Sequence, residues 1–366
     1  MSKQKVLILE TDRSEHANHH PKYQEFKQLF DVKVFKVEST EGLINELKGP
    51  SSDVSAIWTT GHAIYSAGGL LKVVDYFPAS LKVYCFSWVG YTDEEADALK
   101  KRGIIFCNVG DVSQHDVADH ALYLTLSCFR FPGFFEHQFR PTRTIMQSRY
   151  ILGSAGWDDK GEPLPSTKDV NLAYSSSVGG KKVESPTGKT VGIIGLGAIG
   201  KQIGKRLDAI GMKVKYTKRS PLTDQEASTL GYKAEYVQTY KELIKDVDLI
   251  VNAAPHTPET VHMINSETLK TVKKGVRIVN IGRGSAIDED ALLTALDDGT
   301  VCSVGLDVFE GEPNDVDVRF TSRWDVTMTP HIGNVTTDNT VNSNLRCMEN
   351  IINVLIDGGK GVTPIP

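Results

Sequence analysis

A glycine-rich turn in the second half of the chain has residue types and spacing suited to binding phosphate. Behind the apolar run Thr190–Ile194, three glycines follow the pattern G-x-G-x-x-G. In such a turn the first glycine permits a tight bend, the second lets a ligand approach the backbone, and the third lets the next helix pack closely. The helix N-terminus offers N–H groups and a positive dipole to a pyrophosphate. The turn therefore predicts a dinucleotide site, and a plain glycine-rich connection is the alternative. The expected binding residues are Gly195, Gly197, Ala198, Ile199 and Gly200.

The strand after this helix ends in basic and hydroxylic residues. An acid at that place would accept hydrogen bonds from the ribose hydroxyls of NAD and would repel a 2′-phosphate. Lys218, Arg219 and Ser220 stand there instead. A guanidinium can bind a phosphate through two parallel hydrogen bonds, an ammonium adds charge, and a hydroxyl adds a donor. The sequence predicts NADPH/NADP+ as the cofactor, with NADH weaker; the alternative is that the two cations are solvated loop charges.

Short apolar runs alternate with amphipathic stretches in both halves, which is typical of parallel strands joined by helices. The expected strands are 6–9, 32–37, 54–58, 81–86 and 104–107 in the first half, and Thr190–Ile194, Lys213–Thr217, Leu249–Asn252, Val276–Asn280 and 303–306 in the second. Helices are expected at 41–48, Asp93–Lys101 and 115–130. The predicted fold class is α/β, with two doubly wound Rossmann-like domains, parallel sheets and an active-site cleft between the domains.

The glycine turn assigns the cofactor to the second of these domains. We expect residues 109–334 to form the NAD(P)-binding Rossmann domain and residues 1–108 a flavodoxin-like substrate domain. The amphipathic stretch 335–356 has no strand after it and is expected to pack back on the first domain, which makes 335–366 part of a discontinuous substrate domain. The Gly-, Pro- and Ser-rich segment between Arg130 and Thr190 is interpreted as a surface excursion whose role the sequence does not give.

Composition limits the classes of partner. The 366 residues carry a formal charge of −5, which gives no support for a nucleic-acid or membrane-surface partner. Five scattered cysteines without a C-x-x-C spacing disfavour disulfides and structural zinc, and His16, His19 and His20 lack the context of a metal site. No run approaches the roughly 18 apolar residues of a membrane span. The expectation is a cytoplasmic protein without metal.

Three further motifs follow the glycine turn in order: NIGRG at 280–284, GLDVFEGEP at 305–313 and TPHIGN at 329–334. Together they resemble the D-isomer-specific 2-hydroxyacid dehydrogenase family, over most of the chain from Lys82 onward except the segment after Arg130. Within the family the sequence is most similar to NADP-preferring glyoxylate/hydroxypyruvate reductases. Residues 119–130, DHALYLTLSCFR, are also similar to fungal members of the D-mandelate type, which act on bulkier 2-oxo acids.

The resemblance implies reduction of a 2-oxo acid to the D-2-hydroxy acid, with Arg283, Glu312 and His331 as catalytic residues. Hydride reduction of a ketone leaves an alkoxide, so a proton donor must stand beside the oxygen, and His331 suits this role near neutral pH. A carboxylate next to the imidazole favours its charged form and orients the ring, which assigns Glu312 rather than Glu310. Arg283 can bind the substrate carboxylate and polarise the 2-oxo group.

The resemblance also implies residues that contact the ligands without reacting. Asp307 corresponds to the residue that meets the nicotinamide carboxamide. Loops of the substrate domain supply backbone N–H groups to the substrate carboxylate, and His62 beside them is interpreted as a surface residue. The remaining candidates are Pro255 and Thr257 for the cofactor wall, and Thr60, Gly61, Val89 and Gly90 for the substrate.

Two positions depart from the family pattern: Thr92 stands where Asp is usual, and Asp119 where Glu is usual.

Two other functions stay open. A non-catalytic NAD(P)-sensing regulator could share the fold, but it has no need of the three catalytic residues. A formate dehydrogenase typically has Gln in place of Glu312. The helix at 115–130 and the residues after it resemble the family's dimerisation region, so a homodimer is expected.

Overall fold

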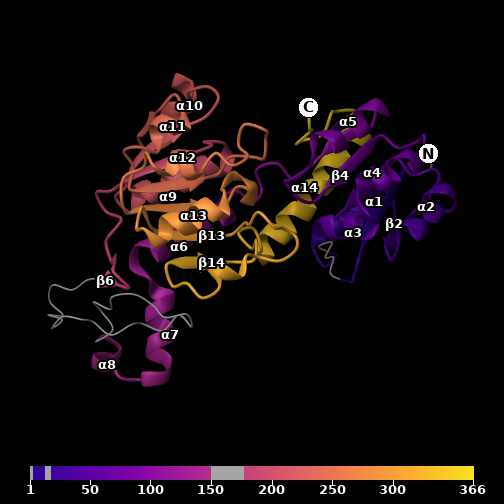
Figure 1. The fold of residues 1–366 in the computed structure, drawn as a ribbon. Coiled ribbons are helices and arrows are strands. Elements are labelled where there is room, and N and C mark those ends of the chain that lie inside the picture. The colour runs from indigo at the N-terminus through magenta and orange to yellow at the C-terminus, as the bar shows by residue number, and fades with distance from the viewer. Residues whose placement is uncertain (1–2, 13–17, 150–176) are drawn as a thin grey trace. The chain divides into compact units, whose positions relative to one another are not determined.

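The computed structural model describes residues 3–12, 18–149 and 177–366, and the chain divides into two units. The first unit comprises residues 1–113 and 335–366, and the second comprises 114–334 (Figure 1). The expected α/β fold class is confirmed, because each unit is built on a parallel sheet with helices between successive strands.

The first unit contains a five-stranded parallel sheet in the order β2-β1-β3-β4-β5. Its strands are β1 (Lys5–Glu10), β2 (Asp31–Lys36), β3 (Ala56–Thr59), β4 (Val83–Phe86) and β5 (Ile105–Cys107). Its helices are α1 (Pro21–Leu29), α2 (Thr40–Lys48), α3 (Gly61–Ser66), α4 (Leu70–Val73), α5 (Asp93–Lys101) and α14 (Thr337–Leu355). This is the flavodoxin-like order, in which ligands bind beyond the carboxyl ends of the strands.

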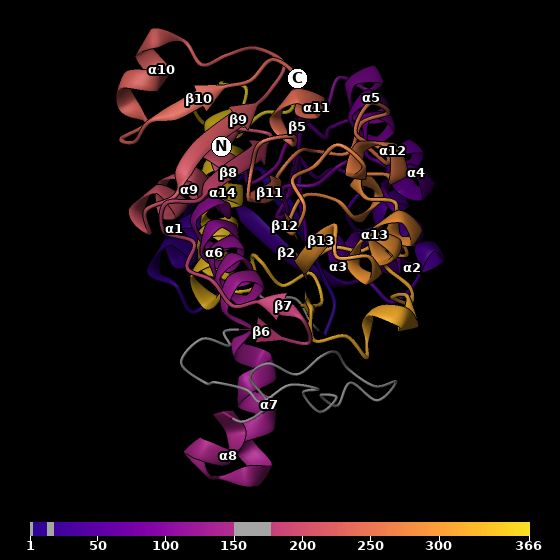
Figure 2. The ribbon, with the colours of Figure 1, turned by 60° about the vertical axis from the view of Figure 1, so that its left-hand side comes forward.

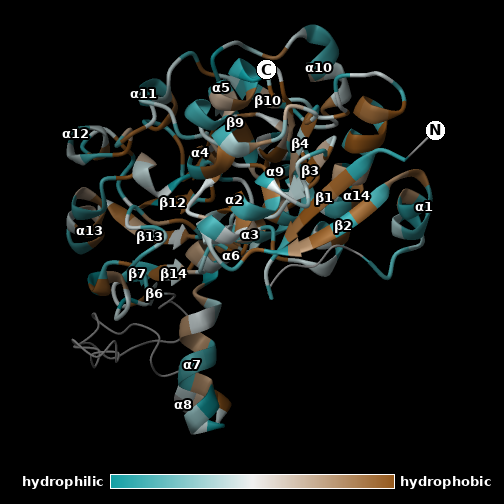
Figure 3. Cartoon of the chain, turned by 90° about the vertical axis from the view of Figure 1, so that its right-hand side faces the viewer, coloured by the Kyte–Doolittle hydropathy of each residue, from teal (hydrophilic) through white to brown (hydrophobic). Residues whose placement is uncertain are grey.

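Buried apolar runs form the centre of this sheet. All residues of β3 and β4 are buried, and so are the four central residues of β1. Strands covered on both faces need continuous rather than alternating hydrophobicity, and hydrophobic colour runs along β1 in Figure 3. The edge strand β2 is largely exposed.

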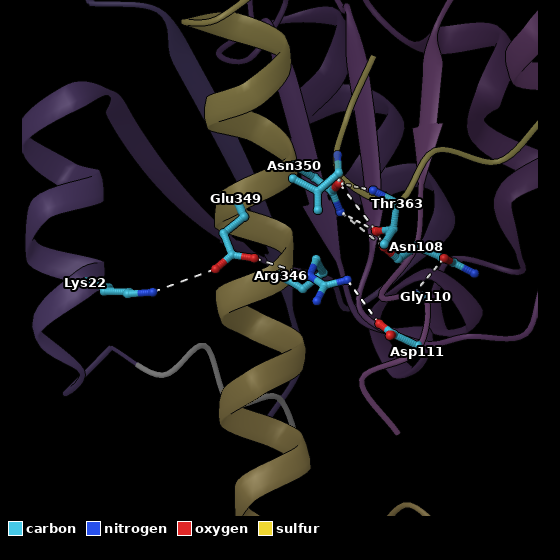
Figure 4. A network of polar contacts seen from close by, with 9 residues as sticks. Lys22, Asn108, Gly110, Asp111, Arg346, Glu349, Asn350 and Thr363 are labelled. Carbon is cyan, nitrogen blue, oxygen red and sulfur yellow. Dashed lines mark hydrogen bonds and ion pairs between the residues drawn. The ribbon is translucent and has the colours of Figure 1, made fainter. Parts of the chain in front are cut away.

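The last helix and the C-terminal residues belong to the first unit, where α14 contacts β4 and α1. Asn350 is fully buried, and its Oδ1 accepts hydrogen bonds from the N–H groups of Val362 and Thr363 at 2.7 and 2.9 Å. Its Nδ2 donates to the carbonyl of Asn108 at 3.1 Å (Figure 4). One amide side chain therefore joins α14, the end of β5 and the terminal segment.

The second unit contains a seven-stranded parallel sheet in the order β10-β9-β8-β11-β12-β13-β14. The run from β10 to β13 can be followed by its labels in Figure 2. Its strands are β8 (Thr190–Ile194), β9 (Lys213–Thr217), β10 (Ala234–Tyr236), β11 (Leu249–Asn252), β12 (Val276–Asn280), β13 (Val301–Leu306) and β14 (Val326–Met328). Its helices are α6 (Gln114–Arg130), α7 (Pro132–Thr142), α8 (Ile145–Arg149), α9 (Ala198–Ala209), α10 (Asp224–Thr229), α11 (Tyr240–Leu243), α12 (Ser266–Leu269) and α13 (Glu289–Asp297). The six strands from β10 to β13 have the Rossmann order, and β14 extends the edge.

Several elements were not expected from the sequence. Helix α1 and the three-residue strands β10 and β14 are too short or too polar for a periodic signal. The segment after Arg130 begins with α7, whose Pro132 occupies the first helical turn, where a missing N–H costs nothing. A small antiparallel pair, β6 (Ser177–Val178) and β7 (Lys181–Lys182), precedes β8. The polar core of the expected surface excursion, residues 153–169, lies outside the described residues.

The stretch WTTGHA at 58–63 is interpreted from the sequence as a loop that ends a strand, but Trp58 and Thr59 belong to β3 and residues 61–63 begin α3. Thr60 is the N-cap of α3, and its Oγ1 accepts a hydrogen bond from the N–H of Ala63 at 3.2 Å. This capping bond begins a helix directly after β3, so Gly61 and His62 lie in its first turn.

Candidate active site

The three expected catalytic residues all follow strands of the second unit, at the carboxyl edge of its sheet. Arg283 follows β12, Glu312 follows β13, and His331 follows β14. His331 Nδ1 lies 2.8 Å from Glu312 Oε2, and Glu312 Oε1 accepts a hydrogen bond from the N–H of Phe309 at 2.8 Å. Both carboxylate oxygens of Glu312 therefore have partners, and Oε2 orients the imidazole of His331, whose side chain is half-exposed.

The charges of these residues act on one another. The hydrogen bond with Glu312 raises the pKa of His331 above its usual value, although burial and the positive charge of Arg283 oppose this. Burial works to raise the pKa of Glu312, but the bonds from His331 and Phe309, with the charge of Arg283, bring it below its usual value. The pair therefore favours an imidazolium beside a carboxylate, which is the state that a proton donor requires.

Asp307 anchors the loop that carries His331. Its buried carboxylate accepts hydrogen bonds from the hydroxyl of Thr329 at 2.7 Å and from the N–H groups of Ile332 and Gly333, both at 2.9 Å. His120 Nε2 lies 3.3 Å from the same carboxylate and 2.8 Å from Thr329 Oγ1. Burial works to raise the pKa of Asp307, and these donors lower it below the usual value. The expected contact of Asp307 with a nicotinamide stays a prediction.

Two buried amides shape the turn that carries Arg283. Asn252 Nδ2 donates to Asn280 Oδ1 at 2.9 Å, and Asn280 Nδ2 donates to the carbonyl of Arg283 at the same distance. A Cβ added to Gly284 would stand 1.9 Å from the carbonyl oxygen of Phe309, so the turn packs directly against the backbone before Glu312. The Arg283 side chain is exposed, and its Nη1 donates to the carbonyl of Gly282 at 2.7 Å.

The glycine turn has the geometry of a phosphate loop. Gly195 has φ +94°, and a Cβ on Gly200 would stand 2.1 Å from the Gly195 carbonyl oxygen. A Cβ on Gly197 would meet no other atom of the described residues within 4 Å. Gly197 is also the N-cap of α9, and no described side chain caps the helix there. The N-terminus of α9, at Ala198 and Ile199, is therefore open to an anion.

Lys218, Arg219 and Ser220 follow β9, beside the glycine turn in the sheet. Lys218 is partly exposed, and the other two are exposed. The pKa of Glu259 is lowered, chiefly by a hydrogen bond with Thr257 and also by the positive charge of Arg219. Glu259 and Arg219 are therefore close enough for their charges to interact. Two cations, a hydroxyl and one carboxylate thus share this surface.

The loop after β11, from Pro255 to Thr260, is fixed by a threonine. Thr260 Oγ1 accepts a hydrogen bond from the N–H of Thr257 at 2.8 Å and donates to the carbonyl of Pro255 at 2.9 Å. His256 Nδ1 lies 2.9 Å from Ser285 Oγ, which ties the loop to the turn after β12. Pro255 and Thr257 therefore lie at the same sheet edge as the glycine turn.

The expected substrate residues lie beyond β3 and β4 of the first unit. Trp88 covers Gly61, where an added Cβ would stand 2.1 Å from the indole ring. The rings of His62 and Tyr65 lie 5.2 and 6.0 Å from that of Trp88. Val89 follows Trp88, and its carbonyl accepts a hydrogen bond from Asn108 at 2.8 Å. Gly90 is partly exposed. The packing of Trp88 on Gly61 was not expected from the sequence, because a single tryptophan in a loop carries no spacing signal.

The two departures from the family pattern have local partners. Thr92 is the N-cap of α5 and forms a capping box with Glu95, a role that Thr and Asp both perform. Asp119 accepts a hydrogen bond from Arg206 Nε at 2.6 Å, which links α6 to α9. Both residues are structural in this chain, so neither departure reaches the catalytic residues.

Two kinds of site are absent from the described residues. These residues contain no group of three or more His, Cys, Asp or Glu placed to hold a metal ion. Among them, too, no helix has the length and apolarity that crossing a membrane requires. His20 caps α1 through Nδ1, whereas His16 lies outside the described residues.

Known proteins match this chain over nearly its whole length. The family model "D-isomer specific 2-hydroxyacid dehydrogenase, NAD binding domain" matches residues 172–333. A putative 2-hydroxyacid dehydrogenase of Saccharomyces cerevisiae is 34% identical, covering 98% of this chain and 96% of its own. Glyoxylate reductase 1 of the same yeast is 32% identical, covering 93% and 90%. The crystal structure of apo D-mandelate dehydrogenase from Rhodotorula graminis superposes with a TM-score of 0.83 at 29% identity, covering 100% and 98%. The expected resemblance is confirmed, and the chain belongs to the D-isomer-specific 2-hydroxyacid dehydrogenase family.

Proposed function

We propose that this chain is an NADPH-dependent 2-oxo acid reductase that forms the D-2-hydroxy acid. The observation that carries the proposal is the bond between His331 and Glu312 beside the charge of Arg283. An oriented, positively charged imidazole next to a guanidinium can both bind an anionic 2-oxo acid and protonate it. The proposal assigns Glu312 rather than Glu310 as the acid partner, because His331 contacts Glu312 while the carboxylate of Glu310 contacts His262.

NADPH, when bound, supplies the hydride that reduces the C2 carbonyl. Arg283 holds the substrate carboxylate and polarises the carbonyl oxygen with its positive charge. His331 Nδ1 is engaged with Glu312, so Nε2 holds the proton that passes to the carbonyl oxygen. The new C–H and O–H bonds complete the alcohol, and the neutral imidazole regains a proton from water. Asp307 keeps the His331 loop in place throughout.

The residues of the second unit fit a phosphorylated dinucleotide. The open space above Gly197 and the uncapped N-terminus of α9 suit the pyrophosphate. Lys218, Arg219 and Ser220 would bind the 2′-phosphate, and Pro255 and Thr257 would line the adenosine side. In this proposal residues 114–334 are the cofactor domain, and the first unit supplies the substrate loops.

The substrate proposal rests on the first unit. Backbone N–H groups at Thr60, Gly61, Val89 and Gly90 are assigned to the substrate carboxylate. The indole of Trp88 lies beside these residues and offers an apolar surface to a substrate side chain. One relative is named for the small acid glyoxylate, and one solved structure is named for the larger D-mandelate. We propose that apolar 2-oxo acids larger than glyoxylate are accepted.

The test is a substrate panel read by loss of the reduced-nicotinamide absorbance. Glyoxylate, hydroxypyruvate, pyruvate and phenylglyoxylate are each assayed with NADPH and with NADH. The proposal expects turnover of pyruvate or phenylglyoxylate, with the higher kcat/KM for NADPH. Cofactor binding without turnover of any acid would favour the regulator. A separate assay of formate with NAD+ or NADP+, read by gain of the same absorbance, tests the formate dehydrogenase alternative.

We also propose that the chain forms a homodimer through α6 to α8. Helices α7 and α8 extend away from the seven-stranded sheet in Figure 2. They and the outer face of α6 expose large apolar side chains: Tyr123, Leu126, Phe139, Ile145 and Met146. A second copy of the chain would cover them. Light scattering at micromolar concentration should give twice the 40.2 kDa of the chain, and a monomer would contradict the proposal.

A further inference from the structure

A second histidine–carboxylate pair is formed by His262 and Glu310, and Glu310 stands two residues before Glu312 in the chain. His262 Nε2 is 2.5 Å from Glu310 Oε1, and both side chains are partly exposed. Neither residue belongs to the proposed proton path, since Glu312 binds His331. The His262–Glu310 pair lies between three loops and has no role in the proposed chemistry.

The pair joins the three segments that surround the reacting groups. The N–H of His262 donates to the carbonyl of Ser285 at 2.8 Å, two residues beyond Arg283. Ile264 then donates to the carbonyl of Ala286 and accepts from the N–H of Asp288, so the two segments run as a short ladder. The imidazole of His262 reaches from this ladder to Glu310.

On the other side, the pair fixes the backbone that orients Glu312. The N–H of Glu310 donates to Glu289 Oε1 at 3.0 Å, while its carboxylate is held by His262. Glu310 is therefore held at both its backbone and its side chain. The preceding N–H, that of Phe309, is the donor that binds Glu312 Oε1. Movement of Glu310 would carry this donor away from Glu312.

The backbone of His262 is shaped for this contact. Its φ is +47°, in the left-handed region that costs energy for a side chain other than Gly, Asn or Asp. Asn265 Nδ2 donates to the carbonyl of His262 at 2.8 Å and supports the conformation. An unfavourable conformation that directs a side chain at a single partner is evidence for a positional role.

We infer that His262 and Glu310 are positioning residues, which hold the Arg283 turn and the Phe309–Glu312 turn together and so keep Glu312 directed at His331. The inference rests on the proposed function for its kinetic consequence and on geometry alone for its structural one. Neither residue touches substrate or cofactor in this assignment.

The experiment breaks the pair from both sides. His262→Gly removes the imidazole and tolerates the positive φ, and Glu310→Ala removes the carboxylate. His262→Asn also tolerates the conformation, but its amide is too short to reach Glu310, so it is a further disruptive variant. Glu310→Gln keeps an acceptor for the imidazole and is the conservative variant. Glu267→Gln is the matched control, since Glu267 is an exposed neighbour on α12 that pairs with Lys270. Thermal unfolding of every variant shows which are folded at the assay temperature.

Two readouts separate positioning from general damage. The first is the proton NMR titration of His331 without cofactor, assigned among the ten histidines by its loss in a His331 variant. The Glu312 bond raises the pKa of His331, so the disruptive variants should move the titration to lower pH, with Glu310→Gln and the control close to wild type. The second is the pH profile of kcat/KM, whose alkaline limb should move the same way while kcat falls about tenfold or more.

The outcomes distinguish the two proposals. A wild type that reduces no 2-oxo acid overturns the proposed function, and the NMR titration still decides the positioning role. An active wild type whose disruptive variants keep the His331 titration and the alkaline limb overturns the positioning role. A double variant, His262→Gly with Glu310→Ala, should do no more harm than either single change, because the two residues act through one contact.

Discussion

His331 Nδ1 and Glu312 Oε2 lie 2.8 Å apart, although 19 residues separate them in the chain. The contact joins the loop after β14 to the loop after β13, which are neighbouring strands of the sheet. It engages Nδ1, and Nε2 is therefore the nitrogen that we propose as the proton donor. The pKa of His331 is raised by this bond, so the protonated ring persists to higher pH than an isolated imidazole would allow.

Changing Glu312 to Gln should alter the pH profile of reduction. Reduction needs a protonated His331, so the rate falls as pH rises through the pKa of this residue. The amide keeps the geometry but removes the negative charge that raises this pKa. The alkaline limb of kcat/KM should therefore move to lower pH, with activity lost there first. An unchanged profile would show that Glu312 does not set the protonation of His331.

Removing the imidazole should abolish most turnover and spare cofactor binding. His331 has φ +52°, so His331→Asn suits the backbone better than Ala and isolates the loss of the proton donor. Loss of a general acid typically costs ~10²–10⁴-fold in rate. NADPH affinity, measured by quenching of protein fluorescence, should change little. Near-normal kcat in a pure sample would remove His331 from the proton path.

Asp307 should matter for stability as well as rate. Asp307→Asn places an NH₂ group where the carboxylate accepts from Thr329 and two backbone N–H groups, leaving a buried donor unpaired. Such a loss costs about 1–3 kcal/mol in the free energy of unfolding. The pKa of Asp307 is lowered in the folded protein, so its contribution is present above the ordinary carboxyl pKa and is lost as pH falls through the folded value. Urea unfolding at neutral and acidic pH should show the difference shrink in acid.

Local sequence was enough to predict the glycine turn and most central strands, because each depends on residues close together in the chain. Long-range pairs gave no such signal. The partners His262 and Glu310 are 48 residues apart, and neither residue type is unusual at its position. The contact of Trp88 with Gly61 likewise appears only when β3 and β4 are paired. The edge strands β10 and β14 have three residues each with a polar residue in the middle, so no apolar run marks them.

Glu259 should weaken the binding of a 2′-phosphate. Its charge acts on Arg219, and a carboxylate near a dianion opposes it. Glu259→Gln should lower KM for NADPH by about two- to fivefold at low ionic strength and leave NADH nearly unchanged, with the effect shrinking as salt is added. Steady-state kinetics with both cofactors at two salt concentrations measure this. An equal effect on both cofactors would place Glu259 away from the phosphate.

The pair Lys218 and Arg219 gives the sharpest test of cofactor choice. If both bind the 2′-phosphate, replacing them with Gln and Ser should raise KM for NADPH and leave NADH nearly unchanged, because NADH has no phosphate there. The loss of one charge-assisted contact in partly screened surroundings should reduce the preference by about tenfold or more. Lys218→Asp should go further, since the carboxylate would repel the phosphate and accept hydrogen bonds from the ribose of NADH. Lys233→Gln is a matched control for removing a cation on the same domain. A wild type that already prefers NADH, or a double variant that keeps its NADPH preference, would refute the phosphate site.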